Sequence, residues 1–279
     1  MLQKRDVIIT SNTIVYMAQL QVENITHSYD INKERLPVLN DLTFSVNTGQ
    51  FVALLGPSGC GKSTLFNIIA GLIQPQRGRI YLNSKRVHGI SGAFGYMQQK
   101  DLLLQWRTVL GNVLIGPELQ KRSYIPFIPL ENQALKLLAQ LGLQGFANSY
   151  PSQLSGGMRQ RVALVRTLLM RKDILLLDEP FGSLDAMTRT VMQSILLDIW
   201  QEGRQTVLLI THDIEEALLL ADKIYVLTAR PASIKAEIDV PLSRPRDIAD
   251  RELIKFKSEL FQMLKVEMEH VFDDQKHQN

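Results

Sequence analysis

A stretch of nine residues, Gly56–Thr64, constrains the fold more than any other part of the chain. It matches the phosphate-loop pattern G-x-x-x-x-G-K-[S/T], follows the apolar run Phe51–Leu55 and precedes the helical stretch Leu65–Leu72. The glycines let the backbone curl so that successive N–H groups point at phosphate oxygens, and the following helix adds its positive N-terminal end. The sequence therefore predicts a strand, loop and helix that together bind a nucleoside triphosphate.

Two side chains of this loop carry most of the expected chemistry. Lys62 can reach the β- and γ-phosphates, and Ser63 can supply a hydroxyl to Mg²⁺. The loop alone does not separate ATP from GTP, or a kinase from a motor. The residues that we expect to bind ATP are Gly56, Pro57, Ser58, Gly59, Cys60, Gly61, Lys62, Ser63 and Thr64.

Two acids follow a second apolar run. Ile174–Leu177 is fully apolar, as is typical of a strand buried on both faces of a parallel sheet, and Asp178 and Glu179 come directly after it. Ligands of such sheets bind at the carboxyl ends of the strands. We therefore expect Asp178 to hold Mg²⁺, directly or through a water, and Glu179 to polarise the attacking water.

Composition and length limit what the chain can be. Its 279 residues are 45% hydrophobic, which suits one large globular domain or two small ones with a sizeable core. A net charge of +3 gives no case for nucleic acid as a partner, because nucleotide binding needs only local positive charge. The longest apolar runs, such as Val207–Ile210, are far shorter than the roughly 18 residues that span a bilayer. We therefore expect any membrane role to come through a partner.

Cys60 is the only cysteine, which excludes an intrachain disulfide and fits a reducing compartment. It lies in the phosphate loop near the N-terminus of a predicted helix, where thiolates are favoured. We therefore expect a thiol alkylator to inhibit the protein and ATP to protect it.

The rest of the pattern indicates an α/β core with a helical insertion. Glu131–Leu141 has apolar residues at helical spacing, in a part of the chain punctuated by prolines, which predicts a helical subdomain at about residues 100–165. We expect an N-terminal extension at 1–17, a nucleotide-binding domain at 18–240 and a C-terminal helical tail at 241–279. The tail is either a regulatory appendage or a helix that packs an apolar stripe on the core, and translation starts at Met1 or at Met17.

One further motif resembles a known family. Leu154–Arg161, LSGGMRQR, is similar to the signature sequence of ABC ATPases, with Met158 where the family usually has Gln. In that family this site closes on the γ-phosphate of ATP held by the other subunit. The resemblance therefore implies that Ser155, Gly156 and Gly157 bind ATP in trans. A Ser before two Gly also makes a helix N-cap, and a cap and an anion site share one geometry.

Four smaller elements are placed as in the same family. Tyr29 corresponds to the aromatic residue that stacks on adenine, a contact worth about 1–3 kcal/mol. Gln99 corresponds to the glutamine that contacts Mg²⁺ and links to the membrane partner. Ser183–Asp185 resembles the loop that crosses the dimer interface in the family, which implies such a place for Asp185, and His212 corresponds to the histidine that contacts the γ-phosphate.

The resemblance covers about residues 18–235 and carries expectations for fold and partners. It implies a P-loop NTPase (RecA-like) core with an antiparallel β subdomain and an inserted α-helical subdomain. It further implies an ATP-hydrolysing enzyme that uses ATP and Mg²⁺ and pairs with a second ATP-binding subunit, expected to be another copy. A permease in the membrane, and a substrate-binding protein acting through it, complete the expected assembly, with this chain at the cytoplasmic face of the membrane.

A subgroup is indicated by the segment after Gln99. Leu102–Val109, LLLQWRTV, is similar to a Leu-Leu-Pro-Trp-x-Thr-Val run of importers for nitrate, sulfonates and taurine, with Gln105 in place of Pro. Met158–Leu169 is at least as close to importers of pyrimidine precursors of thiamine. The transported solute stays open, because this subunit should never touch it.

Two rival functions remain at this stage. A soluble ABC ATPase acting on ribosomes or DNA usually has two nucleotide domains or a long coiled-coil insertion, and this chain has neither. A P-loop kinase or GTPase would bind nucleotide without forming a dimer, and the signature stretch argues against it.

Overall fold

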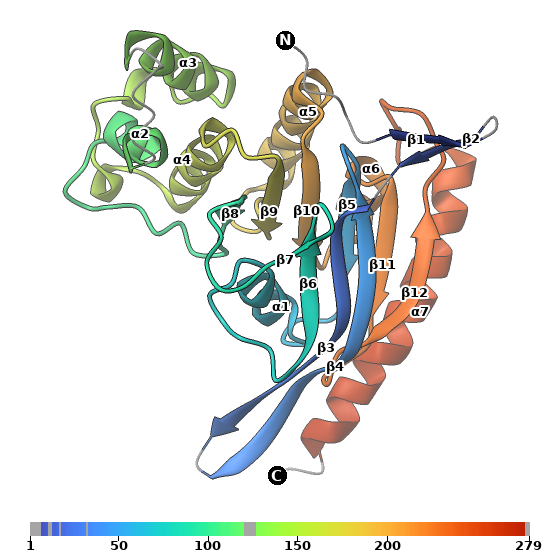
Figure 1. Cartoon of the computed structure of the whole chain (residues 1–279). Helices are drawn as coiled ribbons and strands as arrows, with labels where there is room; N and C mark the ends of the chain where they lie inside the picture. The colour runs from blue at the N-terminus through green and yellow to red at the C-terminus, as the bar shows by residue number, and fades with distance from the viewer. Residues whose placement is uncertain (1–6, 11–12, 17, 32, 120–126, 277–279) are drawn as a thin grey trace. The chain divides into compact units, whose positions relative to one another are not determined.

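The computed structural model describes residues 7–10, 13–16, 18–31, 33–119 and 127–276. Within it the chain forms two compact units (Figure 1). The first unit combines residues 1–92 with residues 206–279, and the second unit spans residues 93–205. The described part contains no helix that is long and apolar enough to cross a membrane.

Parallel strands lie at the centre of the first unit. β5 pairs in parallel with both β10 and β11, and β12 pairs antiparallel with β11, which gives the order β12-β11-β5-β10. Every residue of β5 and β10 is buried, as is typical of strands covered on both faces of a parallel sheet. The strands are β5 (Phe51–Leu55), β10 (Thr206–Thr211), β11 (Lys223–Leu227) and β12 (Ile234–Asp239).

The first unit also contains an antiparallel sheet of order β4-β3-β6-β7 and a separate hairpin, β1-β2. The hairpin falls in the predicted N-terminal extension, and Met17 lies outside the described residues. The strands are β1 (Val7–Thr10), β2 (Thr13–Tyr16), β3 (Ala18–Ile31), β4 (Glu34–Asn47), β6 (Arg77–Leu82) and β7 (Lys85–Arg86).

The helices of the first unit are α1 (Lys62–Ile69), α6 (Ile214–Leu220) and α7 (Arg251–Lys276). The sequence predicts α1 at 65–72, but the helix begins and ends three residues earlier. It ends there because Gly71, at φ 78, takes the left-handed conformation that closes a helix. In α7, Leu253, Leu260 and Leu264 are buried, so the predicted apolar stripe does pack on the unit.

The second unit is mostly helical. β8 and β9 pair in parallel, with Met97 opposite Leu177. The helix predicted at 131–141 begins earlier, at Phe127, and buries Ala134 and Leu138. The elements are β8 (Phe94–Met97), α2 (Val109–Leu119), α3 (Phe127–Gln140), η1 (Gln144–Phe146), η2 (Pro151–Gln153), α4 (Gly156–Leu169), β9 (Ile174–Asp178) and α5 (Ala186–Gly203). The predicted fold class, an α/β core with an antiparallel sheet and a helical insertion, is confirmed.

Arg244 and Arg246, in the segment between β12 and α7, bind the backbone at the C-terminal end of α6. Arg246 donates to the backbone carbonyls of four residues, and Arg244 donates to the carbonyl of Leu220 and pairs with Asp222 at 2.6 Å. Burial, with Arg244 beside it, lowers the pKa of Arg246 to about 10, so the guanidinium stays charged at neutral pH. The four carbonyls bound by Arg246 belong to Leu218, Ala221, Val240 and Leu242.

Replacement of Arg246 should destabilise the first unit. Arg246→Met leaves these carbonyls without their donor, and we expect it to lower the free energy of unfolding by about 3 kcal/mol. Urea unfolding followed by circular dichroism measures the change. Arg251→Met, at an exposed position on the first turn of α7, is the matched control and should shift stability by less than about 0.5 kcal/mol. Equal stability of the two variants would contradict this role of Arg246.

Candidate nucleotide-binding site

The phosphate loop connects β5 to α1, as the sequence predicts. Its backbone requires glycine at Gly61, where φ is 120 and an added Cβ would lie 2.8 Å from Cγ1 of Val38. Ser58 and Gly59 are exposed at the tip of the loop, whereas Gly56 and Pro57 are buried. The tip of the loop is therefore open to solvent, and its first two residues are buried.

The side chain of Lys62 lies within the loop. Only 5% of the residue is exposed, and its Nζ donates hydrogen bonds of 2.8 Å to the carbonyls of Gly56 and Pro57. Ser63, the next residue, is exposed at the first turn of α1. The Lys62 ammonium group therefore lies inside the loop, and Ser63 lies at the solvent-exposed start of α1.

Tyr29 comes from β3 and lies beside the start of α1. Its hydroxyl is 3.4 Å from the Thr64 hydroxyl, and its ring meets the ring of His27 edge-on at 4.9 Å between centroids. Burial lowers the pKa of His27, which keeps that ring neutral at pH 7. The structure therefore brings the predicted adenine-stacking residue next to the predicted phosphate loop.

Cys60 differs from its prediction. The residue is only 1% exposed, so an alkylator has no direct access to the thiol. Burial raises the pKa of Cys60, and this outweighs the opposing effect of the nearby Lys62 ammonium. The expectation of an accessible, thiolate-favoured cysteine is therefore wrong, because the residue is buried within the folded unit and burial disfavours the thiolate.

Alkylation of Cys60 should be slow in the folded protein. A raised pKa means less thiolate at any given pH below it, and burial excludes the reagent, so we expect the rate at pH 7.5 to be at least 10-fold below that of the urea-unfolded chain. Iodoacetamide labelling followed by mass spectrometry measures this cleanly, because the chain has one cysteine. Equal rates in the folded and unfolded protein would show that Cys60 is accessible after all.

His212 follows β10 at the same edge as the phosphate loop. Thr211 pairs with Leu55 across the parallel strands, so the residues after both strands emerge together. His212 is exposed, and Asp213 next to it caps α6 by accepting hydrogen bonds from the backbone of Glu215 and Glu216. This cap holds the backbone of Asp213, the residue that directly follows His212, at the start of α6.

In the second unit the predicted glutamine and acids meet. The register of β8 and β9 brings the residues after both strands to one edge, and Gln99 Nε2 donates to Glu179 Oε2 at 3.2 Å. Asp178 is 2% exposed. The pKa of the Tyr96 hydroxyl is raised, first by the burial of Tyr96 itself and then by the negative charge of Asp178. Glu179 has φ 48, a left-handed conformation that costs a non-glycine residue about 1–3 kcal/mol. Such strain at a candidate catalytic residue requires support from its surroundings.

The signature segment begins α4. Ser155 Oγ accepts a hydrogen bond from the Met158 N–H at 3.2 Å, which makes it the N-cap. Ser155 and Gly156 are exposed, so the positive N-terminal end of the helix is open to an anion. Gly157 is held by close packing, since an added Cβ would lie 2.9 Å from Cδ2 of Leu184.

Asp185 caps α5 in the same way. Its carboxylate accepts from the Thr188 N–H at 3.0 Å, and the hydrogen bonds from Thr188 lower the pKa of Asp185. The residue is exposed at the end of the turn that follows Glu179.

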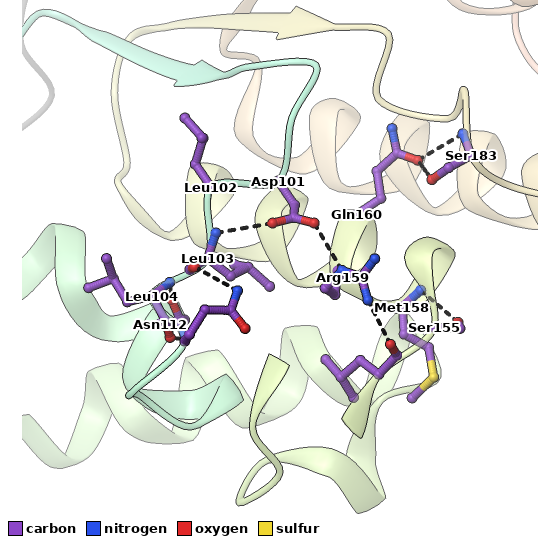
Figure 2. Close-up of polar contacts among 12 residues, drawn as sticks. Asp101, Leu102, Leu103, Leu104, Asn112, Ser155, Met158, Arg159, Gln160 and Ser183 are labelled. Carbon is purple, nitrogen blue, oxygen red and sulfur yellow. Dashed lines mark hydrogen bonds and ion pairs between the residues drawn. The ribbon is translucent and has the colours of Figure 1, made fainter. Parts of the chain in front are cut away.

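A polar network around α4 was not predicted from the sequence (Figure 2). Arg159 pairs with Asp101 at 3.1 Å, and Asn112, fully buried, bonds the backbone of Leu104 in both directions. Trp106 lies between Asp101 and Asn112 in the sequence, and 74% of the residue is exposed. No sequence pattern marks these partners, because each pair joins residues that are distant along the chain or ordinary in type.

Known proteins that resemble this chain all point to one family. A family model described as ABC transporter matches residues 39–182. An uncharacterized ABC transporter ATP-binding protein of Methanocaldococcus jannaschii is 43% identical over 250 residues, which cover 90% of this chain and 92% of that protein. The chain belongs to the ABC transporter ATP-binding family. It is therefore an ABC-type ATPase, and the kinase and GTPase alternatives are excluded.

Other relatives in this family carry more specific names. An aliphatic sulfonates import ATP-binding protein of Rhodococcus jostii is 47% identical over 225 residues, covering 80% of this chain and 85% of that protein. A taurine import ATP-binding protein of Pelagibacter ubique is 42% identical over 228 residues, covering 81% and 85%. The predicted likeness to the sulfonate and taurine group is thus confirmed at the level of sequence.

Solved structures agree on the family fold. The dimeric structure of a bacterial ABC transporter cassette matches with a TM-score of 0.73 and 29% identity, over 80% of this chain and all of that one. A post-hydrolysis state of the same cassette, bound to ADP and Pi, matches equally well.

Proposed function

We propose that this chain is the ATP-hydrolysing subunit of an ABC importer, acting at the cytoplasmic face of a membrane. The observation that carries the proposal is the likeness to ATP-binding proteins named for taurine and sulfonate import, which extends over about four-fifths of this chain. A soluble ABC ATPase working on ribosomes or DNA is disfavoured, because none of these relatives is named for such a role.

The first unit is proposed to hold the nucleotide. Tyr29 stacks on adenine and the backbone of residues 56–64 cradles the phosphates. The Nζ of Lys62, already turned into the loop, binds the β- and γ-phosphates. His212, at the same strand edge as the loop, contacts the γ-phosphate. These roles explain why the loop combines the constrained backbone at Gly61 with the buried ammonium group of Lys62.

The donors proposed for Mg²⁺ are Ser63, Gln99 and Asp178. Hydroxyl, amide and carboxylate oxygens suit this hard cation, which keeps several waters and takes few protein ligands. The ion would neutralise charge on the phosphate oxygens.

Glu179 is proposed as the general base. Its carboxylate accepts from Gln99, which orients Oε2, and it would accept a proton from the water that attacks the γ-phosphate. Gln99 therefore has two proposed tasks, a contact with Mg²⁺ and orientation of Glu179. Both are compatible with its position two residues after the end of β8.

A second copy of the chain is proposed to complete each site. The N-terminus of α4, with Ser155, Gly156 and Gly157, binds the γ-phosphate of ATP held by the partner. Asp185, at the N-terminus of α5, contributes to the same contact. The open helix end supplies a hydroxyl, backbone N–H groups and a positive dipole for that contact. The dimeric state of a structural relative supports a homodimer.

The membrane partner is proposed to be a permease that docks on the segment around Trp106. This exposed aromatic lies between backbone anchors supplied by Asp101 and Asn112, so it is presented on a fixed support. A substrate-binding protein would act through the permease. The cargo is proposed to be a small sulfonate such as taurine, with nitrate and thiamine-precursor pyrimidines as the alternatives.

Removal of the general base should trap the dimer. Glu179→Gln keeps the size of the side chain but cannot accept the proton, so we expect ATP hydrolysis to fall by about 10²–10⁴-fold while ATP binding remains. Size-exclusion chromatography with light scattering should then show a dimer with ATP and Mg²⁺. Lys62→Ala, which loses the phosphate contact, should lose hydrolysis without trapping the dimer. A Glu179→Gln chain that stays monomeric at saturating ATP would contradict the shared site.

Docking on the permease should depend on Trp106. We expect Trp106→Ala to reduce co-purification with the membrane permease, because an exposed aromatic anchor is typical of interface hot spots. Phe146→Ala, at another exposed aromatic of the second unit, is the matched control and should leave the complex intact. Retention of the permease by Trp106→Ala, or equal loss with Phe146→Ala, would count against this docking site.

A further inference from the structure

Gln160 lies on the second turn of α4 and uses both ends of its side-chain amide. Its Nε2 donates to the backbone carbonyl of Glu179 at 2.8 Å. Its Oε1 accepts from the Ser183 N–H at 3.0 Å and from the Ser183 hydroxyl, as Figure 2 shows. The residue is only 7% exposed. Both residues bonded by this one buried side chain, Glu179 and Ser183, therefore belong to the turn that begins with Glu179.

The turn is also closed by its own backbone. The carbonyl of Glu179 accepts a second hydrogen bond from the Gly182 N–H at 3.2 Å, and the Leu184 N–H donates to the Phe181 carbonyl at 3.1 Å. Gln160 thus bridges the first residue and the fifth residue of a compact turn. It holds both ends of the turn against α4.

Glu179 needs this support more than an ordinary residue would. Its φ of 48 is left-handed, and a non-glycine residue keeps such a conformation only where its surroundings enforce it. The direction of its side chain follows from that backbone. Release of the carbonyl would allow Glu179 to return to a commoner conformation, which would turn the carboxylate away from Gln99.

We propose that Gln160 is a positioning residue for the reaction, which holds the backbone of Glu179 so that its carboxylate faces the attacking water. The proposal rests on the proposed role of Glu179 as general base. It also gives α4 two tasks. Its N-terminus reaches the partner's ATP, while its second turn sets the glutamate that serves this chain's own ATP.

Three full-length variants test this role. Gln160→Leu removes all three side-chain hydrogen bonds at similar volume, and Gln160→Glu keeps an acceptor for Ser183 but loses the donor to the Glu179 carbonyl. Gln193→Leu, on α5 and also 7% exposed, is the matched control for loss of a buried amide. ATPase rates over a range of ATP concentrations and thermal unfolding are measured for all three.

We expect Gln160→Leu and Gln160→Glu to lower kcat by about 10- to 100-fold, since a displacement of about 1 Å can cost that much. KM for ATP should change less than about 2-fold, because the residues proposed to bind ATP in the first unit are untouched. Gln193→Leu should keep kcat. A general loss of stability would instead lower the Tm of all three variants and would not separate kcat from KM.

A double-mutant cycle separates positioning from packing. In a Glu179→Gln background, Gln160→Leu should cause no further loss of the residual hydrolysis, because the group that it positions is already gone. Independent, multiplicative losses would overturn the proposal, as would an unchanged kcat in Gln160→Leu. Full activity of Glu179→Gln alone would instead overturn the proposed function, so the two failures are distinguishable.

Discussion

Parallel pairing of buried strands is the constraint on which both halves of the candidate site depend. Strands that run in one direction release their following residues at one edge, and β5 with β10, and β8 with β9, do so within their own units. The phosphate loop and His212 emerge from one pair, and Gln99, Asp178 and Glu179 from the other. Within each unit, the paired apolar strands therefore bring together residues that are far apart in sequence.

The helix α4 adds a second constraint to the edge of β9. Ser155 caps its exposed N-terminus. Arg159 and Gln160, which follow one another along the helix, bind Asp101 and the turn that begins with Glu179, respectively. A displacement of α4 therefore cannot leave either segment unchanged. The buried amide of Gln160 is costly to leave unpaired, about 1–3 kcal/mol, which keeps these contacts together.

The sequence predicts the elements that follow from local rules and misses those that depend on distant partners. The bounds of β5 and β9 were predicted to within one residue, because each strand coincides with a short apolar run in the sequence. The candidate site residues were found through motifs whose spacing is local, although their roles stay predictions. The burial of Cys60 was missed, because loop position does not say which way a side chain points. Gln160 was missed because a glutamine in a helix is ordinary until its partners are seen.

The C-terminal segment is tied to the first unit by charged groups as well as by its apolar stripe. Glu267 of α7, only 6% exposed, accepts from the Ala229 N–H at 2.7 Å and from Lys235 Nζ at 2.6 Å. A buried carboxylate is tolerated only when it is paired and hydrogen-bonded, so this contact specifies one docking position for the helix. Together with Arg246 on the carbonyls at the end of α6, it makes the segment part of the folded unit. Of the two expectations for the tail, packing on the core therefore accounts for the contacts observed.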